Sequence, residues 1–390
     1  MSDLPMDVTA DILSRLPVKS LLRFRCASKP WCALIDSPDF IKSHLNRSIE
    51  TNTNRSIIFG VEDLYSIDLN SLDNAVELDN PMKNDEGTSL VVSFDGLVVL
   101  CKNIYEDVTL WNPSTRKHRK LPVSKVRFPP GFRIIVIVFG LGYDSVNDDY
   151  KLVRMAQFEG KDYDSFDSEV EIYSVKSNTW RRVQDFPYYF PLQGSPGVTF
   201  NGAVHWVVTR KPKSDTANLI AAFDLGLEEY RLVPQSDFFD ENGYLNVAAL
   251  GDCLCVVCNY GGVRADIWVM KEYGVKESWT KLFAIAKPSV IRSFFYVSPL
   301  AYSMSCGEVL LKLGGGRLFW YDIRKKTLKK IQIRGWESLV RANLCVESLV
   351  RLHGDGKKDG KKQQAQKKTM KQNSRKKKDD FLSKGFKLVL

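Results

Sequence analysis

The chain has 390 residues, a formal net charge of +10, and 44% apolar and 11% aromatic residues. This length exceeds what one ordinary hydrophobic core encloses, so we expect a small module beside one large domain. Eight cysteines are too few for a disulfide framework, and residues 1–17 interleave Asp3, Asp7 and Asp11 with apolar residues, unlike a secretory signal. The longest apolar run, near residues 134–139, is about half as long as a membrane-spanning helix. These features favour a soluble protein in a reducing compartment.

Residues 4–45 carry apolar side chains at helical spacing, which predicts three short helices. Pro5 is suited to begin the first helix because its missing N–H costs nothing there, and Pro17 is expected to end it. Ser20 is a candidate cap for the second helix. The segment therefore reads as a compact helical module.

The third predicted helix begins after Ser28, whose side chain suits the N-cap position, and ends at Pro38. Three helices of about two turns each cannot enclose a complete core, so part of their apolar surface needs a cover. That cover is either a partner protein or the rest of the same chain. Helical spacing alone does not separate a docking module from an internal cap.

After residue 50 the apolar residues recur at every second position, in a pattern of strand, polar turn and strand. The pattern recurs at intervals of 44 to 62 residues and begins at Leu64, Val108, Val170, Ile220, Ile267 and Leu318. Most repeats follow another strand that starts after a glycine, as in GLVVL from Gly96. A four-stranded propeller blade takes about 40 to 50 residues. We therefore predict a mainly β fold with a β-propeller of about six or seven blades, an array of sandwiches being the alternative.

The last predicted strand, in residues 344–352, has the sequence LCVESLVRL. We expect it to pair with the first blade near residues 57–59. This pairing would close the ring and leave no open sheet edge.

Beyond His353 the composition changes to lysine, glutamine, glycine and aspartate. Residues 354–380 hold eleven Lys or Arg against four Asp, which predicts a disordered basic tail before an apolar end at residues 381–390. The densest basic patch is a candidate nuclear import signal, a solvated linker being the alternative, and consists of Arg375, Lys376, Lys377 and Lys378. Without interleaved aromatic residues, specific nucleic-acid recognition by the tail is not expected.

The residue types that bind metals or act as nucleophiles form no recognisable site. In a strand, Cys253 and Cys255 face one side and Cys258 the other, which does not build a tetrahedral zinc site. The four histidines share no ligand spacing, and no G-x-S-x-G nucleophile motif is present. We expect no catalytic residue, metal or cofactor.

Two other motifs have structural interpretations. The acidic residues 144–150 lack the ligand spacing of a calcium-binding loop, so we expect a solvated loop. Residues 314–316 are glycines between two predicted strands and read as a hairpin turn. The tryptophans of the repeats are expected to fill the wedges between blades.

The order of motifs in LPMDVTADILSRLPVKSLLRFRCASKPWCALIDSPDFIKSHL resembles the F-box. An F-box implies binding to a Skp-type adaptor, and through it to cullin and RING subunits of an SCF ubiquitin ligase, as a non-catalytic adaptor. Pro30, before the tryptophan, departs from the more usual polar residue. The residues expected to contact the adaptor are Leu4, Pro5, Ile12, Leu13, Leu16, Pro17, Leu21, Leu22, Trp31 and Leu34.

The strings VTLWNPSTRKHRKLP and FGLGYDSVNDDYKLVRM resemble the plant F-box-associated domain, a kelch-like substrate-binding region. Over its full length, the chain is similar to plant F-box proteins that repress defence. The resemblance implies that the target is an immune receptor of the nucleotide-binding leucine-rich-repeat (NLR) class, degraded after ubiquitination, in the nucleus and cytoplasm.

The expected organisation is an F-box in residues 1–46 and a kelch-like propeller in residues 47–353, followed by the basic tail and the apolar end. Two other classes of function are kept as alternatives. One is a propeller-type binding protein, lectin or hydrolase acting outside ubiquitination, and the other is a nucleic-acid-binding protein.

Overall fold

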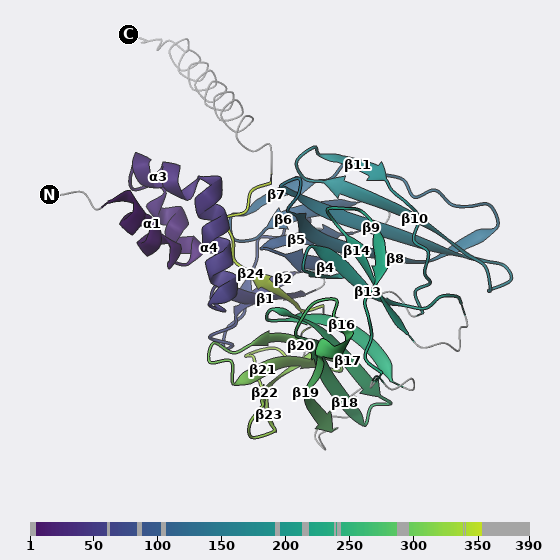
Figure 1. Ribbon diagram of the computed structural model, residues 1–390. Coiled ribbons are helices and arrows are strands. Elements are labelled where there is room, and N and C mark those ends of the chain that lie inside the picture. Colours follow the sequence, from purple (N-terminus) through teal and green to yellow (C-terminus); the bar gives the residue numbers. More distant parts are fainter. Residues whose placement is uncertain are drawn as a thin grey trace, which may run out of the picture. The chain divides into compact units, whose positions relative to one another are not determined.

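The computed structural model describes residues 5–60, 63–83, 88–102, 107–191, 196–212, 218–237, 239, 243–286, 296–337, 339 and 341–352. In this part of the chain, four helices precede 24 strands (Figure 1). The expected tail with Arg375 to Lys378, the apolar end and Leu4 lie outside the described residues. Among the described residues, no helix is both long enough and apolar enough to cross a membrane.

The N-terminal module contains four helices rather than the predicted three: α1 (Met6–Ser14), α2 (Val18–Phe24), α3 (Lys29–Ile35) and α4 (Pro38–Glu50). Ser28 caps α3 as predicted, accepting a hydrogen bond from the Trp31 backbone N–H at 3.2 Å. The third helix ends before Pro38, as predicted, but the fourth helix that Pro38 begins was not predicted. Pro38 follows the N-cap Ser37, whose hydroxyl accepts from the Phe40 N–H at 3.3 Å, and so begins α4.

The second helix also begins earlier than predicted. Pro17 occupies its N-cap position, and Ser20 lies inside the helix. The apolar stripes of the four helices meet in one cluster of buried residues: Leu13, Val18, Leu21, Ile35, Phe40 and Leu349. Burial of each such side chain contributes about 1.5 to 3 kcal/mol, so this small core depends on every member.

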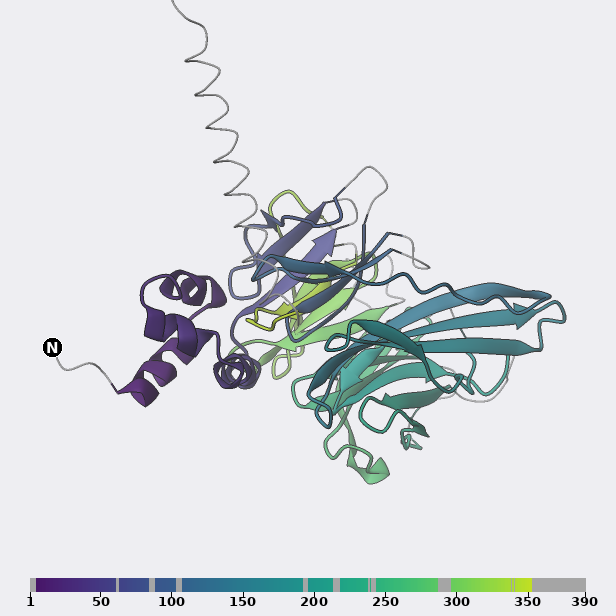
Figure 2. The same ribbon diagram turned by 90° about the horizontal axis from the view of Figure 1, so that it is seen from above.

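The rest of the described chain forms six antiparallel four-stranded sheets, which settles the blade count at six. The first blade contains β24 (Asn343–Val346), β1 (Arg55–Gly60), β2 (Leu64–Asp68) and β3 (Val76–Glu77). The second contains β4 (Ser89–Phe94), β5 (Leu97–Cys101), β6 (Val108–Asn112) and β7 (Lys117–Lys120). The third contains β8 (Phe132–Asp144), β9 (Asp149–Gly160), β10 (Phe166–Ser174) and β11 (Thr179–Arg182). Figure 2 shows the long strands of this third blade from above.

The fourth blade contains β12 (Val198–Phe200), β13 (Ala203–Val208), β14 (Leu219–Asp224) and β15 (Tyr230–Leu232). The fifth contains β16 (Tyr244–Leu250), β17 (Cys253–Tyr260), β18 (Arg264–Met270) and β19 (Trp279–Ala286). The sixth contains β20 (Val297–Tyr302), β21 (Glu308–Leu313), β22 (Arg317–Asp322) and β23 (Thr327–Lys330). All six predicted strand–turn–strand repeats are the third and fourth strands of a blade.

The ring closes as predicted from the sequence, because β24 pairs with β1 in antiparallel register, Leu344 opposite Ile57. The closing strand is shorter than the predicted 344–352, since β24 ends at Val346. The chain after β24 is fixed by Asn112, whose side-chain amide donates to the carbonyl oxygens of Ser348 at 3.1 Å and Val350 at 2.9 Å. Asn112 belongs to the Asn-Pro-Ser-Thr signature. That signature therefore serves ring closure, far from its own position in sequence.

A shared turn chemistry explains why the outer hairpins recur. In four blades a side chain at the end of the third strand accepts backbone N–H bonds from the turn, and a residue four positions later has positive φ. These pairs are Asn112 and Arg116, Ser174 and Asn178, Asp224 and Glu228, and Asp322 and Lys326. The same local geometry thus produces the same sequence pattern.

The packing between strands confirms most of the structural interpretations. Four repeat tryptophans are buried, namely Trp111, Trp206, Trp268 and Trp279, whereas Trp180 and Trp320 are half-buried. Cys255 and Cys258 are buried in β17, and Cys253 is half-buried. His205 is buried as well, and burial lowers its pKa to about 4. Residues 314–316 form the turn between β21 and β22.

Candidate functional site

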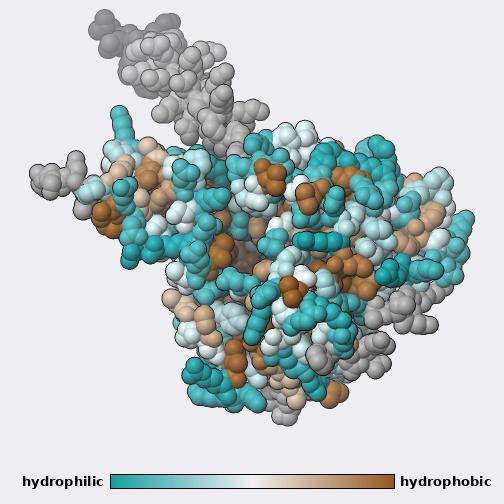
Figure 3. Space-filling view, viewed as in Figure 1, coloured by the Kyte–Doolittle hydropathy of each residue, from teal (hydrophilic) through white to brown (hydrophobic). Residues whose placement is uncertain are grey.

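The helical module carries an uncovered apolar surface on α1 and α2. Met6, Val8, Ile12 and Phe24 are 49%, 44%, 46% and 37% exposed. Val8 and Ile12 lie four residues apart and so share one face of α1 with the exposed Pro5. Figure 3 shows hydrophobic residues at the surface of this module. An exposed cluster of this kind on a small module is typical of a protein-docking surface.

The residues predicted to bind an adaptor fall into three groups in the structure. Pro5, Ile12 and Pro17 are exposed, and Leu16, Leu22, Trp31 and Leu34 are half-buried. Leu13 and Leu21 are only 2% and 0% exposed. These two leucines form the core of the module, which gives them no surface to offer a partner. Their contribution to docking is to hold the helices in place.

Met6, Val8 and Phe24 belong to the exposed apolar surface but were not among the predicted contact residues. The spacing of Pro5, Val8 and Ile12 as i, i+3 and i+7 could have identified α1 as the exposed face. Phe24 carried no such signal. Its ring packs edge-on against that of Trp31, with 5.6 Å between the ring centroids.

The module is also joined to the closing segment of the propeller. Leu349 packs in the helical cluster, and the Glu347 N–H donates to the Asn54 carbonyl oxygen at 2.7 Å. The Asn54 side chain in turn donates to the hydroxyl of Ser48, on α4, at 2.9 Å. The module is therefore covered on one side by its own chain, while α1 and α2 keep an open face. The interpretation as an internal cap is confirmed in part, and docking of a partner on the open face stays a prediction.

The two ends of the propeller differ in the length of their connections. We call the end where α4 leads into β1 the near face. The connections within blades at this end are from two residues long, as in 251–252, to eight residues long, as in 271–278. The fourth strand of each blade leads to the next blade at the opposite end, the far face. The connection of this kind that is described in full, residues 121–131, has eleven residues. Long connections on a rigid scaffold are where binding residues concentrate.

A channel with a volume of about 1040 Å³ lies between the innermost strands, and it is lined mainly by small and apolar residues. Three lining carboxylates, Glu50, Asp95 and Asp252, belong to α4 and to near-face turns. Burial raises the pKa of Asp95 to about 6, although Tyr150 donates a hydrogen bond to it. The carboxylates that line the channel therefore lie toward its near-face end.

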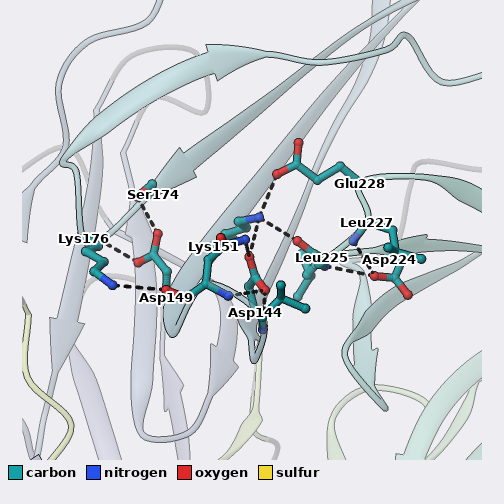
Figure 4. A network of polar contacts seen from close by, with 12 residues as sticks. Asp144, Asp149, Lys151, Ser174, Lys176, Asp224, Leu225, Leu227 and Glu228 are labelled. Atoms are coloured by element: carbon teal, nitrogen blue, oxygen red, sulfur yellow. Dashed lines mark hydrogen bonds and ion pairs between the residues drawn. The ribbon is translucent and has the colours of Figure 1, made fainter.

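A buried polar network joins the third and fourth blades (Figure 4). The Lys151 amine lies 2.7 Å from carboxylate oxygens of both Asp144 and Glu228, and donates to the Leu225 carbonyl oxygen at 2.7 Å. Asp149 accepts a hydrogen bond from the Lys176 N–H at 2.8 Å. The expectation that residues 144–150 form a solvated loop was wrong for Asp144 and Asp149, since both carboxylates are buried. Asp144 pairs with Lys151, which reaches the fourth blade, whereas Asp149 is bonded within the third blade.

The part of the chain that the structure describes contains no group of three or more His, Cys, Asp or Glu side chains placed to hold a metal ion. Its recognisable surfaces are the apolar face of the helical module and the far face of the propeller. Both are suited to binding proteins.

Comparison with known proteins covers both parts of the chain. Two family models match: "F-box domain" over residues 1–43 and "F-box associated beta propeller domain" over residues 57–352. The chain is 40% identical to F-box protein CPR1 and 34% identical to F-box protein At4g22390, both from Arabidopsis thaliana and both over the full length of each chain. Protein SUPPRESSOR OF NIM1 1 from the same plant is 28% identical over 85% of this chain and 93% of its own.

Proposed function

Since the chain belongs to the F-box proteins that carry an F-box associated β-propeller, we propose that it is the substrate-recognition subunit of an SCF-type ubiquitin ligase. In this role it joins two proteins and performs no chemistry itself. The ubiquitin-transferring subunits are recruited through the helical module, and the target is held by the propeller.

The observation that carries this proposal is the open apolar face of α1 and α2. Met6, Val8 and Ile12 expose apolar side chains on one short helix, and grouped exposed apolar side chains mark an interaction site. A Skp-type adaptor that covers them would gain about 1.5 to 3 kcal/mol for each fully buried side chain. Four of the other predicted contacts lie half-buried on the same module, namely Leu16, Leu22, Trp31 and Leu34.

We assign the target to the far face. The near face holds the link to α4 and mostly short turns, whereas the far face carries the longer connections between blades, such as residues 121–131. A target bound there lies across the propeller from the connection to the adaptor-binding module. That arrangement leaves both surfaces free to be occupied together.

The finer proposal is that the target is an NLR-class immune receptor and that its degradation represses plant defence. It is supported by the full-length identity of 40% to CPR1. The proposed locations are the nucleus and cytoplasm, with Arg375 to Lys378 as the import signal.

The test is affinity purification of the full chain from plant cells in which the ligase is inhibited. We expect the Skp-type adaptor, a cullin and a RING subunit to co-purify, together with an NLR receptor that accumulates under inhibition. Recovery of the propeller with other proteins but without any of the ligase subunits would contradict the proposal. Recovery of the ligase with a different target would contradict only the finer part.

A further inference from the structure

Lys312 breaks the sequence pattern of the propeller. It stands five residues after Gly307, on the second strand of the sixth blade. In the second, fourth and fifth blades, the residue five positions after the matching glycine is apolar or weakly polar. These residues are Cys101, Val207 and Val256. Cys101 and Val256 are fully buried. A charge at a position that the fold fills with apolar side chains is expected at functional rather than structural sites.

The surroundings of Lys312 do not neutralise its charge. It pairs in register with Leu318, and Leu310, two residues earlier on the same strand face, is buried. Its amine donates to the Ala342 carbonyl oxygen at 3.2 Å, and no charged group among the described residues contributes to the shift of its pKa. Burial lowers the pKa of Lys312. Lys312 is half-buried, and a partly buried charge without an opposite charge is unfavourable, so an anionic group beside it would be stabilising.

Lys312 lines the channel at the far face. β24 runs antiparallel to β1, with Val346 opposite Arg55 at the near end and Asn343 opposite Ile58 toward the far end. Ala342, which accepts the hydrogen bond from Lys312, precedes Asn343 and so marks the far end. Arg341 lines the same end, is exposed, and donates to the hydroxyl of Ser89.

The shape and charge of this end favour an anionic ligand. The β21–β22 turn beside Lys312 consists of glycines. A Cβ on Gly315 would meet no atom within 4 Å, so the tip of the turn is open, whereas Gly316 packs against the Leu339 backbone. The carboxylates that line the channel, Glu50, Asp95 and Asp252, all belong to near-face elements. Two cations therefore face the far mouth without a lining carboxylate beside them in the described part of the chain.

We propose that the far mouth of the channel binds an acidic segment of the target polypeptide, with carboxylates placed between Lys312 and Arg341. This inference rests on the proposed function and adds the chemical class of the recognised segment. A polypeptide is favoured over a free anion because the channel volume of about 1040 Å³ far exceeds what one small ion fills, and its other lining residues are mainly small and apolar.

The test uses the full chain and a Glu-Ser repeat peptide that carries a photo-cross-linker, with the matching Gln-Ser peptide as the uncharged comparison. We expect the acidic peptide to cross-link to the β21–β22 turn and to residues near Arg341, and the Gln-Ser peptide not to do so. Lys312→Met and Arg341→Gln should each reduce this cross-linking by about tenfold, a factor that corresponds to the loss of one charged contact. Lys329→Met, the same substitution on the exposed face of β23, should leave it unchanged.

Three results would overturn the proposal. The first is that all cross-links fall in residues 354–380, and the second is that the two peptides label the chain equally. The third is that the Lys312→Met variant is labelled at the far mouth as strongly as the wild type. Displacement of the peptide by an equal concentration of inorganic phosphate would instead identify a free anion as the ligand. Lys312→Met should unfold at a temperature no lower than the wild type, because it removes an unbalanced charge. It should still co-purify with the adaptor, so failure here is distinguishable from failure of the ligase function.

Discussion

Ile12→Arg is expected to weaken binding to a Skp-type adaptor by at least about a hundredfold. Ile12 is 46% exposed, so the substitution places a charge in the docking surface without entering the core of the module. Loss of one buried aliphatic side chain costs about 1.5 to 3 kcal/mol, and a guanidinium buried without a partner adds to that cost. Isothermal titration of the purified full chain with recombinant adaptor measures the effect.

The matched control is Val263→Arg, which introduces the same charge at a residue 68% exposed on the propeller. It should bind the adaptor as the wild type does. Both variants should keep the unfolding temperature of the wild type, because exposed substitutions outside special backbone positions usually change stability by less than about 0.5 kcal/mol. Wild-type affinity in Ile12→Arg would show that the adaptor binds elsewhere.

Lys151→Met is expected to have the largest effect on stability, roughly 3 to 5 kcal/mol of unfolding free energy. The side chains of Lys151 and Asp144 are 6% and 0% exposed, so removal of the amine leaves a buried carboxylate without its counter-ion. Burial alone raises the pKa of Asp144, and the hydrogen bonds from Lys151 and Asn147 more than reverse this effect. Denaturant unfolding followed by circular dichroism gives the free energy.

The pH dependence identifies the cause of this loss. The wild-type pKa of Asp144 lies below its ordinary value, so the stability that this group contributes is present at neutral pH and declines as pH falls through the folded pKa. In Lys151→Met that pKa should rise, so the gap between variant and wild type should narrow in acid. Lys151→Met combined with Asp144→Asn should regain part of the loss at neutral pH.

Lys161→Met is the control, since Lys161 is exposed on the β9–β10 turn of the same blade. We expect a change below about 0.5 kcal/mol. A loss in Lys161→Met equal to that in Lys151→Met would show that the buried network is not the source. A loss in Lys151→Met that stays the same at every pH would argue against the buried carboxylate.

The blades were predictable because their signals are local. Each outer hairpin repeats one turn chemistry within a few residues, such as Asp322 followed by Lys326 at positive φ. The exact blade count was not readable from spacing, because the interval from Val108 to Val170 reached 62 residues. The long β8 and β9 account for that interval. The spacing was therefore compatible with both six and seven blades.

The errors arose where structure depends on distant residues. Asp144 looked like part of a solvated acidic loop because its burial depends on Leu225 and Glu228, which lie 74 and 77 residues after Lys151. Ile12 and Leu13 are adjacent in the motif, yet one is exposed and the other is buried. Which of them faces outward depends on packing against Phe40 and Leu349, and the motif alone does not contain that information.

The most direct test of the account is hydrogen exchange of the full chain with and without the Skp-type adaptor. The account predicts that slowed exchange is concentrated in α1 and α2, residues 6–24, while the far-face connections of the propeller are unchanged. Slowed exchange on the far face, with none in α1 and α2, would contradict the proposal that the adaptor binds the helical module and the target binds the propeller.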